Sequence, residues 1–353
     1  MTALVAVSRL HSWRPHDCTL NDAIAIEFVQ WRILIVKRTI DETKKARYMA
    51  EAKVLRAYFY YKLNIVYKGV PIYLEPVEAS ECYEGQSSEA EVWKTVINDL
   101  TEAIAEPALP EKYGEGAAEY GRATKGLAYA LRGKAYLYQK DYANAARDFE
   151  AVGSCGYSLF QGEYKQLFKE ANEQSSEMIF SVQCIGLSGL GNEISFRYGT
   201  RSSFGSCWNT YLASTDFVES YENADGSPFD WDDYIPGYNE MDVKACSVYC
   251  LRDGMTDDEK TKLANAGADM SKYLPEGNER RWEFNGEGIN FFDEMRWGTW
   301  KESKFFAGSG LKQMWGEPQY VYAWSGDQVY TWPAPWSERQ LNEDLTLADG
   351  WKD

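Results

Sequence analysis

The segment 280–305 carries the residues of this chain that are best suited to acid–base chemistry. It reads RRWEFNGEGINFFDEMRWGTWKESKF, with Glu283 and Glu287 in one group of carboxylates and Asp293 and Glu294 in another. Glycosidases use two carboxyl groups roughly 5–9.5 Å apart, one as the acid and the other as the base or nucleophile. A carboxylate-dependent glycosidase is therefore one hypothesis for this chain.

The same segment also has a structural interpretation, which we favour. Gly286 and Gly288 interrupt any continuous helix, so Glu283 and Glu287 are not expected to share a face. Arginine–carboxylate pairs beside large apolar residues account for this composition without catalysis. We expect the acids to pair with Arg280, Arg281 and Arg296, and we predict that the protein is not an enzyme.

Histidine and cysteine usage gives no catalytic or metal-binding pattern. The two histidines, His11 and His16, both lie near the N-terminus, so any imidazole base or ligand would have to come from there. The seven cysteines are scattered, and the closest pair, Cys246 and Cys250, matches no strong zinc spacing. We predict no catalytic residue, no metal site and no cofactor.

Charge and hydropathy exclude further classes of function. The chain has 54 acidic against 37 basic residues, a net charge of −17, and no basic run, so nucleic acid is not expected as a partner. No segment approaches the ~18 apolar residues of a membrane span, and the opening MTALVAVSRL is too short for a signal-peptide core. Aromatic residues make up 15% of the chain, which favours a binding surface.

Helical periodicity dominates residues 41–153. Apolar residues recur every three or four positions from Ala46 to Tyr61, and Gly69 and Pro71 end this helix. Ser88 and Glu91 form a capping box before a second helix that ends ahead of Pro107. The segments 44–67 and 90–104 therefore resemble a helical hairpin with a long connecting loop.

Residues 124–153 predict a tighter hairpin. Thr124 and Asp141 are good N-caps, and Gly153 is a good C-terminal stop. Small and aromatic residues fall at the offsets of a tetratricopeptide repeat, in which close helix crossing needs Gly or Ala. These residues are Gly133, Ala145, Tyr136, Tyr142 and Phe149. Because such repeats need neighbours to bury their faces, at least one further helix is expected.

Periodicity fades after about residue 160. Gly, Ser, Asn and Tyr dominate residues 184–249, which predicts irregular loops with short helices near 215–221 and 256–266. Loops of this length on a helical scaffold are uncommon unless they have a function.

Four segments in this order resemble the SusD/RagB-like family of outer-membrane nutrient-binding lipoproteins. They are AEAKVLRAYFYYKLNIVYKGVPIYLEP, ATKGLAYALRGKAYLYQKDYANAARDFEAV, ERRWEFNGEGINFFDEMRWGTW and TWPAPWSERQLNEDLTLADGW. The resemblance implies a mainly α fold, in which tetratricopeptide-like hairpins form a scaffold and long irregular loops form a ligand-binding face. We expect one domain over 1–353, with the helical scaffold at 41–153, the loop-rich binding region at 154–279 and a C-terminal segment at 280–353 that packs on the scaffold.

The resemblance also implies a function. Members of the family capture oligosaccharides or polysaccharides at the outer-membrane surface and deliver them to a TonB-dependent, SusC-like transporter, without catalysis. Members are anchored by a lipidated cysteine after a secretion signal, and residues 1–40 resemble neither. An Arg-Asp-Pro-Arg motif common in the family is also missing before Arg280, so the chain resembles a shortened or internally deleted relative.

Aromatic residues in the loops are the candidate ligand contacts. Sugar rings pack their C–H faces on indole and phenol rings, while polar neighbours bond the hydroxyl groups. The predicted platform consists of Trp208, Tyr211, Trp231, Tyr234 and Tyr238, which lie among aspartates and asparagines. A second aromatic group, Trp315, Tyr320, Tyr322 and Trp324, lies in a Gly-rich segment.

A third hypothesis is a helical-repeat module that binds protein partners. It predicts ligand contacts on the inner faces of the helices within 44–153 instead of on the later loops.

Overall fold

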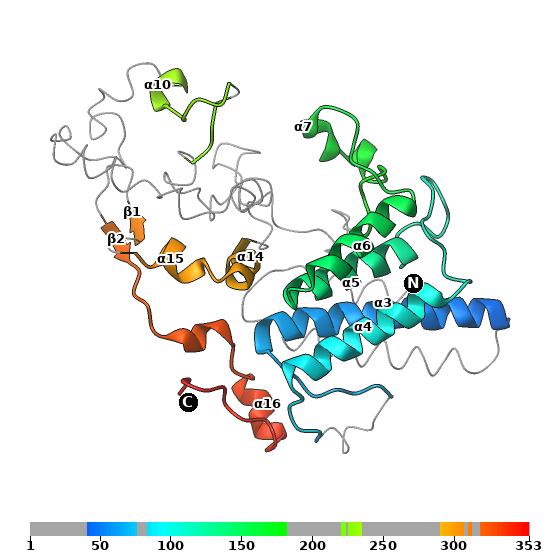
Figure 1. The fold of residues 1–353 in the computed structure, drawn as a ribbon, viewed down its shortest axis with the longest axis horizontal. Coiled ribbons are helices and arrows are strands. Elements are labelled where there is room, and N and C mark those ends of the chain that lie inside the picture. Colours follow the sequence, from blue (N-terminus) through cyan, green and yellow to red (C-terminus); the bar gives the residue numbers. More distant parts are fainter. Residues whose placement is uncertain are drawn as a thin grey trace, which may run out of the picture. The chain divides into compact units, whose positions relative to one another are not determined.

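The computed structural model describes residues 41–75, 83–181, 220–223, 225–234, 290–306, 310–312 and 318–352. The chain divides into two compact units, Met1–Glu193 with Asp327–Asp353 and Ile194–Gly326. The described residues are mainly helical, with one two-stranded sheet, which confirms the predicted fold class (Figure 1). The predicted domain boundaries stay a prediction.

The first helical hairpin consists of α3 (Glu42–Tyr67) and α4 (Glu89–Ala105). The predicted capping box at the start of α4 is confirmed, because Ser88 Oγ accepts from Glu91 N and Glu91 accepts from Ser88 N. Helix α3 ends at a left-handed residue, Lys68 with φ 55°, and Gly69 follows with φ 131°. The predicted helix end before Gly69 is therefore confirmed.

The second hairpin consists of α5 (Lys125–Tyr138) and α6 (Tyr142–Ser154), which pack beside the first (Figure 1). The predicted N-caps are confirmed: Thr124 accepts from Leu127 N, and Asp141 accepts from Asn144 N. The predicted stop at Gly153 is wrong. Helix α6 continues through it, and the left-handed glycine after the helix is Gly156, with φ 92°.

Close packing at Gly133 confirms the tetratricopeptide-like crossing of α5 and α6. A Cβ on Gly133 would lie 2.6 Å from the ring of Phe149, so a side chain at this position would force the ring to move. Apolar side chains at the helix interfaces are fully buried, including Val54, Ala57, Val96 and Leu100. The core of the first unit therefore lies between the four helices.

Each hairpin contains an arginine–aspartate pair that joins its two helices. Arg56 on α3 donates from Nε and Nη2 to Asp99 on α4, with both distances 2.7 Å. Arg132 on α5 donates from the same two atoms to Asp148 on α6, at 2.7 and 2.8 Å. Burial lowers the pKa of Arg56, but the bonds to Asp99 outweigh it and raise the pKa above its usual value. The two hairpins thus share an internal ion pair as well as a packing pattern.

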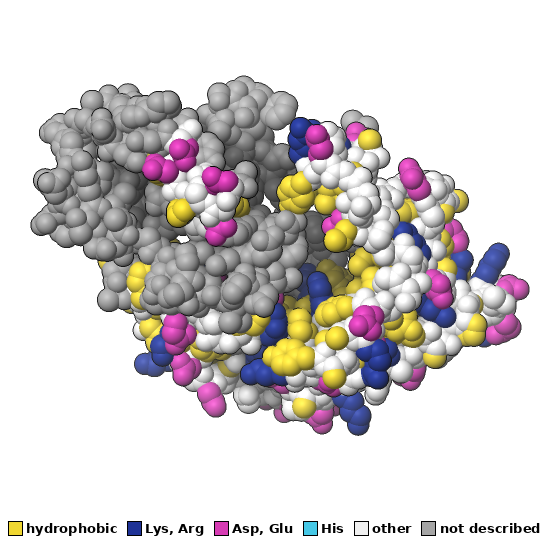
Figure 2. All heavy atoms as spheres, turned by 45° about the horizontal axis from the view of Figure 1, so that its top comes forward, with side chains coloured by type: hydrophobic (Ala, Val, Ile, Leu, Met, Phe, Trp, Pro, Cys, Tyr) yellow, Lys and Arg dark blue, Asp and Glu magenta, His cyan; other side chains and the backbone are white. Residues whose placement is uncertain are grey.

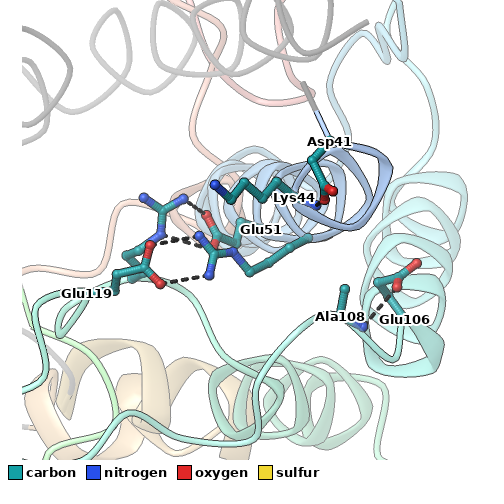
Figure 3. A network of polar contacts seen from close by, with 8 residues as sticks. Asp41, Lys44, Glu51, Glu106, Ala108 and Glu119 are labelled. Carbon is teal, nitrogen blue, oxygen red and sulfur yellow. Dashed lines mark hydrogen bonds and ion pairs between the residues drawn. The ribbon is translucent and has the colours of Figure 1, made fainter. Parts of the chain in front are cut away.

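A second polar network ties α3 to the loop before α5 (Figure 3). Arg47 donates two hydrogen bonds to Glu119, at 2.7 and 2.8 Å, and Arg122 pairs with Glu51. The guanidinium groups of Arg47 and Arg122 lie 5.1 and 4.8 Å from the ring centre of Tyr48. Because Glu51 is buried, this network anchors the loop to the scaffold.

The chain after Asp327 returns to the first unit. It contains the 3-10 helix η7 (Asp327–Tyr330) and α16 (Trp336–Leu341). Trp332 N donates to Val66 O of α3 at 3.0 Å, and Asn342 Nδ2 donates to Glu84 O at 3.0 Å. The C-terminal residues therefore bond to α3 and to the loop that precedes α4.

Short elements complete the described chain. The first unit also has α7 (Tyr164–Leu167) and the 3-10 helix η3 (Glu170–Asn172). The second unit has α10 (Trp231–Tyr234), α14 (Asn290–Trp297) and α15 (Trp300–Lys304). Strands β1 (Gly310–Lys312) and β2 (Pro318–Val321) pair antiparallel, with Leu311 opposite Tyr320.

Charged side chains of both signs alternate on the surface. On the face drawn in Figure 2, the described acidic and basic side chains are interspersed with apolar ones, and they form no basic stripe.

Candidate functional site

A compact turn over residues 221–233 positions Trp231, the member of the predicted platform whose side chain is described. Asn223 N donates to Ser227 O at 2.8 Å, and Glu222 and Pro228 form an isolated antiparallel bridge. Gly226 has φ 81°, a left-handed conformation in which a residue with a Cβ is strained. The backbone therefore folds back on itself just before the tryptophan.

The side chain of Asn223 holds this turn together. Its Nδ2 lies 3.0 Å from Ser227 Oγ, 3.1 Å from Pro228 O and 3.0 Å from Asp233 Oδ2. The bond to Asp233 joins the turn to α10, the helix that begins at Trp231. A side chain that hydrogen-bonds the local backbone stabilises a turn in one conformation. Trp231 is therefore carried on a pre-organised support.

Trp231 contacts one aromatic ring and has acidic residues near it in the sequence. Its ring centre lies 4.9 Å from that of Phe229, with the rings perpendicular, and part of the indole reaches solvent. Asp230 and Asp233 are exposed on either side. Carboxylates accept hydrogen bonds from hydroxyl groups, and an indole face packs on apolar C–H groups. The turn thus offers both kinds of contact that a sugar ring needs.

Tyr234 is the last residue of α10, so it follows Trp231 within the same helical turn. Trp208, Tyr211 and Tyr238 lie outside the described residues. The predicted grouping of these five residues stays a prediction.

Two members of the second aromatic group belong to a packed cluster. The ring centre of Trp324 lies 5.0 Å from Phe305 and 5.8 Å from Trp300, and Phe305 lies 6.2 Å from Tyr322. Trp300 and Phe305 were not singled out from the sequence, although their place just after the RWG triplet is an available signal. Lys301 Nζ lies 5.0 Å from the ring centre of Trp324. The contacts stabilise α15 against the segment that follows β2.

The other two members of this group cannot be placed in the cluster. Trp315 lies outside the described residues. Tyr320 is a residue of strand β2, where its backbone pairs with that of Leu311.

Two carboxylates of the segment 280–305, those of Asp293 and Glu294, make structural pairs. Asp293 and Arg296 are 3.3 Å apart, which confirms the predicted partner of that arginine. Glu294 is 1% exposed and bonds Ser303 Oγ at 3.1 Å and Lys304 Nζ at 3.0 Å, a lysine that the sequence analysis did not name. A carboxylate enclosed in this way is poorly placed to reach a substrate.

Glu283, Glu287, Arg280 and Arg281 lie outside the described residues.

Among residues 41–75, 83–181 and the later described segments, no cluster of three His, Cys, Asp or Glu side chains could hold a metal ion. Over the same residues, no helix has the length and apolar character needed to cross a bilayer.

Comparison with known proteins gives a consistent family. A family model described as "Starch-binding associating with outer membrane" matches residues 24–137. A SusD-like protein of Formosa agariphila is 30% identical over 145 residues, which is 40% of this chain and 27% of that protein. A SusD-like protein of Bacteroides ovatus is 26% identical over 207 residues, 53% of this chain and 36% of that protein. The resemblance to SusD-like proteins is confirmed.

Solved SusD-like structures share the fold. A SusD-like carbohydrate-binding protein of Bacteroides fragilis aligns with a TM-score of 0.68 at 21% identity, over 92% of this chain and 85% of that one. A laminarin-binding SusD-like protein aligns at 0.67 and 22% identity, over 94% and 85%. A structure with a xylogluco-oligosaccharide aligns at 0.65 and 16% identity, over 94% and 88%. At these identities the likeness shows the fold alone, and this chain's matched segments span about a third of the two curated relatives' length.

Proposed function

We propose that this protein binds an oligosaccharide or polysaccharide without catalysis, through aromatic side chains on its later loops. The contacts are Trp208, Tyr211, Trp231, Tyr234 and Tyr238. The observation that carries the proposal is the Asn223 turn, which precedes the partly exposed Trp231 and bonds the exposed Asp233 of the same helix. A binding site gains affinity when its contact groups are already ordered before the ligand arrives.

The chemistry of the turn suits a carbohydrate better than an apolar ligand. An indole ring supplies a flat surface for the C–H face of a sugar, and carboxylates at its rim accept hydrogen bonds from hydroxyl groups. Asp230 and Asp233 are exposed carboxylates within two residues of Trp231 in the sequence. The solved relatives support the same ligand class, because two of them are described with laminarin or with a xylogluco-oligosaccharide.

Transport is the second part of the proposal. The matching family model is described as associating with the outer membrane. On this basis the protein acts at the cell surface, held by a lipid anchor, and passes its glycan to a TonB-dependent, SusC-like transporter. Co-purification with the transporter encoded beside its gene, from detergent-solubilised outer membranes, tests this part. Recovery of the protein in the membrane fraction without any transporter would contradict it.

Two alternatives predict different contacts. The described positions inside the helical hairpins, such as Val54, Val96 and Leu100, are filled by core packing and so are closed to a peptide. Asp293 and Glu294 are paired and buried, which disfavours them as the carboxylates of a glycosidase. Both observations favour the loops as the place of binding.

Affinity electrophoresis against a panel of polysaccharides tests the proposal. We expect the wild-type protein to be retarded by at least one glycan, and Trp208→Ala and Trp231→Ala each to be retarded less. Unchanged retardation of both variants on every glycan that the wild type binds would overturn the loop platform. Release of reducing sugar from the same glycans would favour the enzyme instead.

A further inference from the structure

The segment that carries the predicted platform is acidic throughout. Residues 202–243 contain all five platform residues and nine Asp or Glu, and they contain no Lys, Arg or His. These 42 residues therefore carry −9 of the chain's net charge of −17. A concentration of one sign of charge affects binding where its carboxylates lie beside the ligand. The position of the carboxylates on the Asn223 turn is therefore decisive.

The turn brings two of these carboxylates together. Asp225 Oδ1 accepts from Ser227 N at 2.9 Å, and Asp233 Oδ2 accepts from Asn223 Nδ2 at 3.0 Å. Asn223 Nδ2 also lies 3.0 Å from Ser227 Oγ, so both carboxylates are fixed to the same bonded pair of residues. Both are exposed, and so is Glu222, in the bridge that closes the turn. The platform tryptophan of α10 thus follows a turn that carries anions and no cation.

The carboxylates of the turn are charged at neutral pH. Hydrogen bonds from the hydroxyl and the N–H of Ser227 lower the pKa of Asp225 below its usual value of 3.8. An ionised carboxylate accepts hydrogen bonds and donates none. The turn therefore suits a ligand that supplies donors and carries no negative charge of its own.

Two basic side chains of the second unit are held by other partners. Arg296 pairs with Asp293 at 3.3 Å. Lys304 pairs with Glu294 at 3.0 Å. Both acids are buried, so release of either cation to an anionic ligand would leave a buried carboxylate without its counter-charge, which is strongly destabilising. These two cations are therefore unsuited to pair with a bound anion.

We propose that the ligand of this turn is a neutral glycan, and that the acidic segment 202–243 rejects glycans that carry carboxylate or sulfate groups. This inference rests on the proposed function, because it specifies the ligand of the same site. Sugar hydroxyl groups donate to carboxylates, and hydrogen bonds to an ionised acceptor are the stronger kind. A uronate or a sulfate ester would instead place a like charge beside fixed carboxylates. Repulsion of the wrong ligand is one of the two ways in which a site becomes specific.

Coulomb's law gives the size of the repulsion. One carboxylate about 8 Å from an anionic group of the ligand lowers the affinity roughly two- to threefold in water, and several carboxylates act together. The Debye length is also about 8 Å at an ionic strength of 0.15 M, so salt screens much of this repulsion. Weak binding of an anionic glycan should therefore strengthen as salt is added, whereas binding of a neutral glycan should not change.

A chemically matched series of glycans tests the charge preference. Each neutral polysaccharide that retards the wild type, with laminarin as the first candidate, is oxidised at its primary hydroxyl groups to carboxylates. Part of the product is then methyl-esterified, which removes the charge and keeps the oxidised carbon. At low salt we expect the oxidised form to bind at least about tenfold more weakly than the starting glycan, and the ester to recover most of the affinity. Equal affinity for the oxidised and starting forms, or binding of the oxidised form that weakens as salt is added, would overturn the proposal.

Removal of charge from the turn should relax the preference. Glu222 and Asp225 are exposed and lie outside the predicted platform, so Glu222→Gln with Asp225→Asn removes two charges and keeps two polar side chains. We expect this double variant to bind the oxidised glycan about fivefold more tightly than the wild type at low salt, and the neutral glycan equally well. Glu150→Gln, which neutralises an exposed carboxylate on α6 of the first unit, is the matched control and should change neither affinity. Wild-type affinity of the double variant for the oxidised glycan would contradict a role for these charges.

The tryptophan variants separate this proposal from the proposed function. Loss of neutral-glycan binding in Trp231→Ala, together with equal binding of the oxidised form by the wild type, would overturn the charge preference alone. A wild type that is retarded by charged polysaccharides and by no neutral one would also overturn the preference and leave glycan binding standing. Retardation by no polysaccharide at all would overturn both.

Discussion

Asp99 of α4 accepts two hydrogen bonds from the guanidinium group of Arg56 on α3, and both side chains are more than nine-tenths buried. Arg56 also donates to Leu74 O at 2.7 Å, in the loop that connects the two helices. One arginine thus joins both helices of the first hairpin to their connection. The loop that replaces the short tetratricopeptide turn is held where it leaves the helix.

Removing one partner of this pair should be costly. We predict that Asp99→Ala lowers the free energy of unfolding by roughly 3–5 kcal/mol, because it leaves the Arg56 guanidinium buried without its counter-charge. Urea denaturation followed by circular dichroism measures the change. The double variant Arg56→Met with Asp99→Leu should recover much of the loss, since no charge is then buried.

A pair on the same two helices provides the control. Lys53 and Glu102 also join α3 to α4, but Glu102 is largely exposed. We expect Glu102→Ala to change the free energy of unfolding by at most about 1 kcal/mol. Equal losses for Asp99→Ala and Glu102→Ala would contradict a special role for the buried pair.

The glycine at the crossing of α5 and α6 gives a second prediction. Gly133→Ala should destabilise the protein by roughly 1–3 kcal/mol, because its new methyl group meets the Phe149 ring. Gly153→Ala, at an open helical position, should instead be neutral or stabilising by up to about 1 kcal/mol, since alanine favours the helix. Thermal unfolding at low protein concentration measures both. If Gly153→Ala lowered the stability more than Gly133→Ala, the crossing of α5 and α6 would not depend on Gly133.

The Arg47–Glu119 pair predicts a dependence on pH. The hydrogen bonds from Arg47 lower the pKa of Glu119 below its usual 4.5, so the folded state favours the carboxylate. The pair between Arg47 and Glu119 therefore stabilises the folded state fully at a pH above 4.5. This stabilisation is lost as the pH falls through the lower pKa that Glu119 has in the folded state.

Glu119→Gln isolates this contribution. The wild type should be more stable than Glu119→Gln at neutral pH, and the difference should shrink as the pH falls below 4.5. The urea midpoints of the wild type and of Glu119→Gln, measured from neutral pH to below pH 4.5, test this prediction. A difference that stays constant down to low pH would mean that the ionisation of Glu119 does not contribute.

The turn at Asn223 gives a prediction about binding. Asn223→Ala removes the bond to Asp233 and loosens the support of Trp231, so we expect the glycan Kd to rise by about tenfold. Gln161→Ala, which removes an exposed side-chain bond in the first unit, serves as the control. Isothermal titration measures both variants. An unchanged Kd for Asn223→Ala would show that the turn does not need this side chain to present the tryptophan.

The helical part of the fold could be predicted from the sequence because its signals are local. The side chains of Ser88, Thr124 and Asp141 each accept a hydrogen bond from the backbone nitrogen three residues later and so cap a helix. Gly133 marks the point where α5 and α6 pack closely. Gly153 was misread because a glycine inside a helix and one just past its end look alike in sequence. The left-handed backbone at Gly156 depends on where the helix stops.

The candidate site was harder to predict because its support comes from specific side-chain bonds. The sequence pointed to Trp231, but nothing in residue type showed that Asn223 would bond Asp233, ten residues away. The partner of Glu294 was missed for the same reason, since Lys304 meets it through the geometry of α14 and α15. Ion pairs of this kind follow from how short helices are placed, which has no local signal.

Glycan titration of Trp231→Ala against matched variants tests the central claim most directly. With a glycan that retards the wild type, we predict that Trp231→Ala weakens binding at least about tenfold, as for a contact residue of 1.4 kcal/mol or more. Trp231→Phe should retain part of the affinity, because it keeps a ring face, and Trp336→Ala, an exposed tryptophan of the first unit, should leave it unchanged. Wild-type affinity in Trp231→Ala, or an equal loss in Trp336→Ala, would contradict glycan binding at this turn.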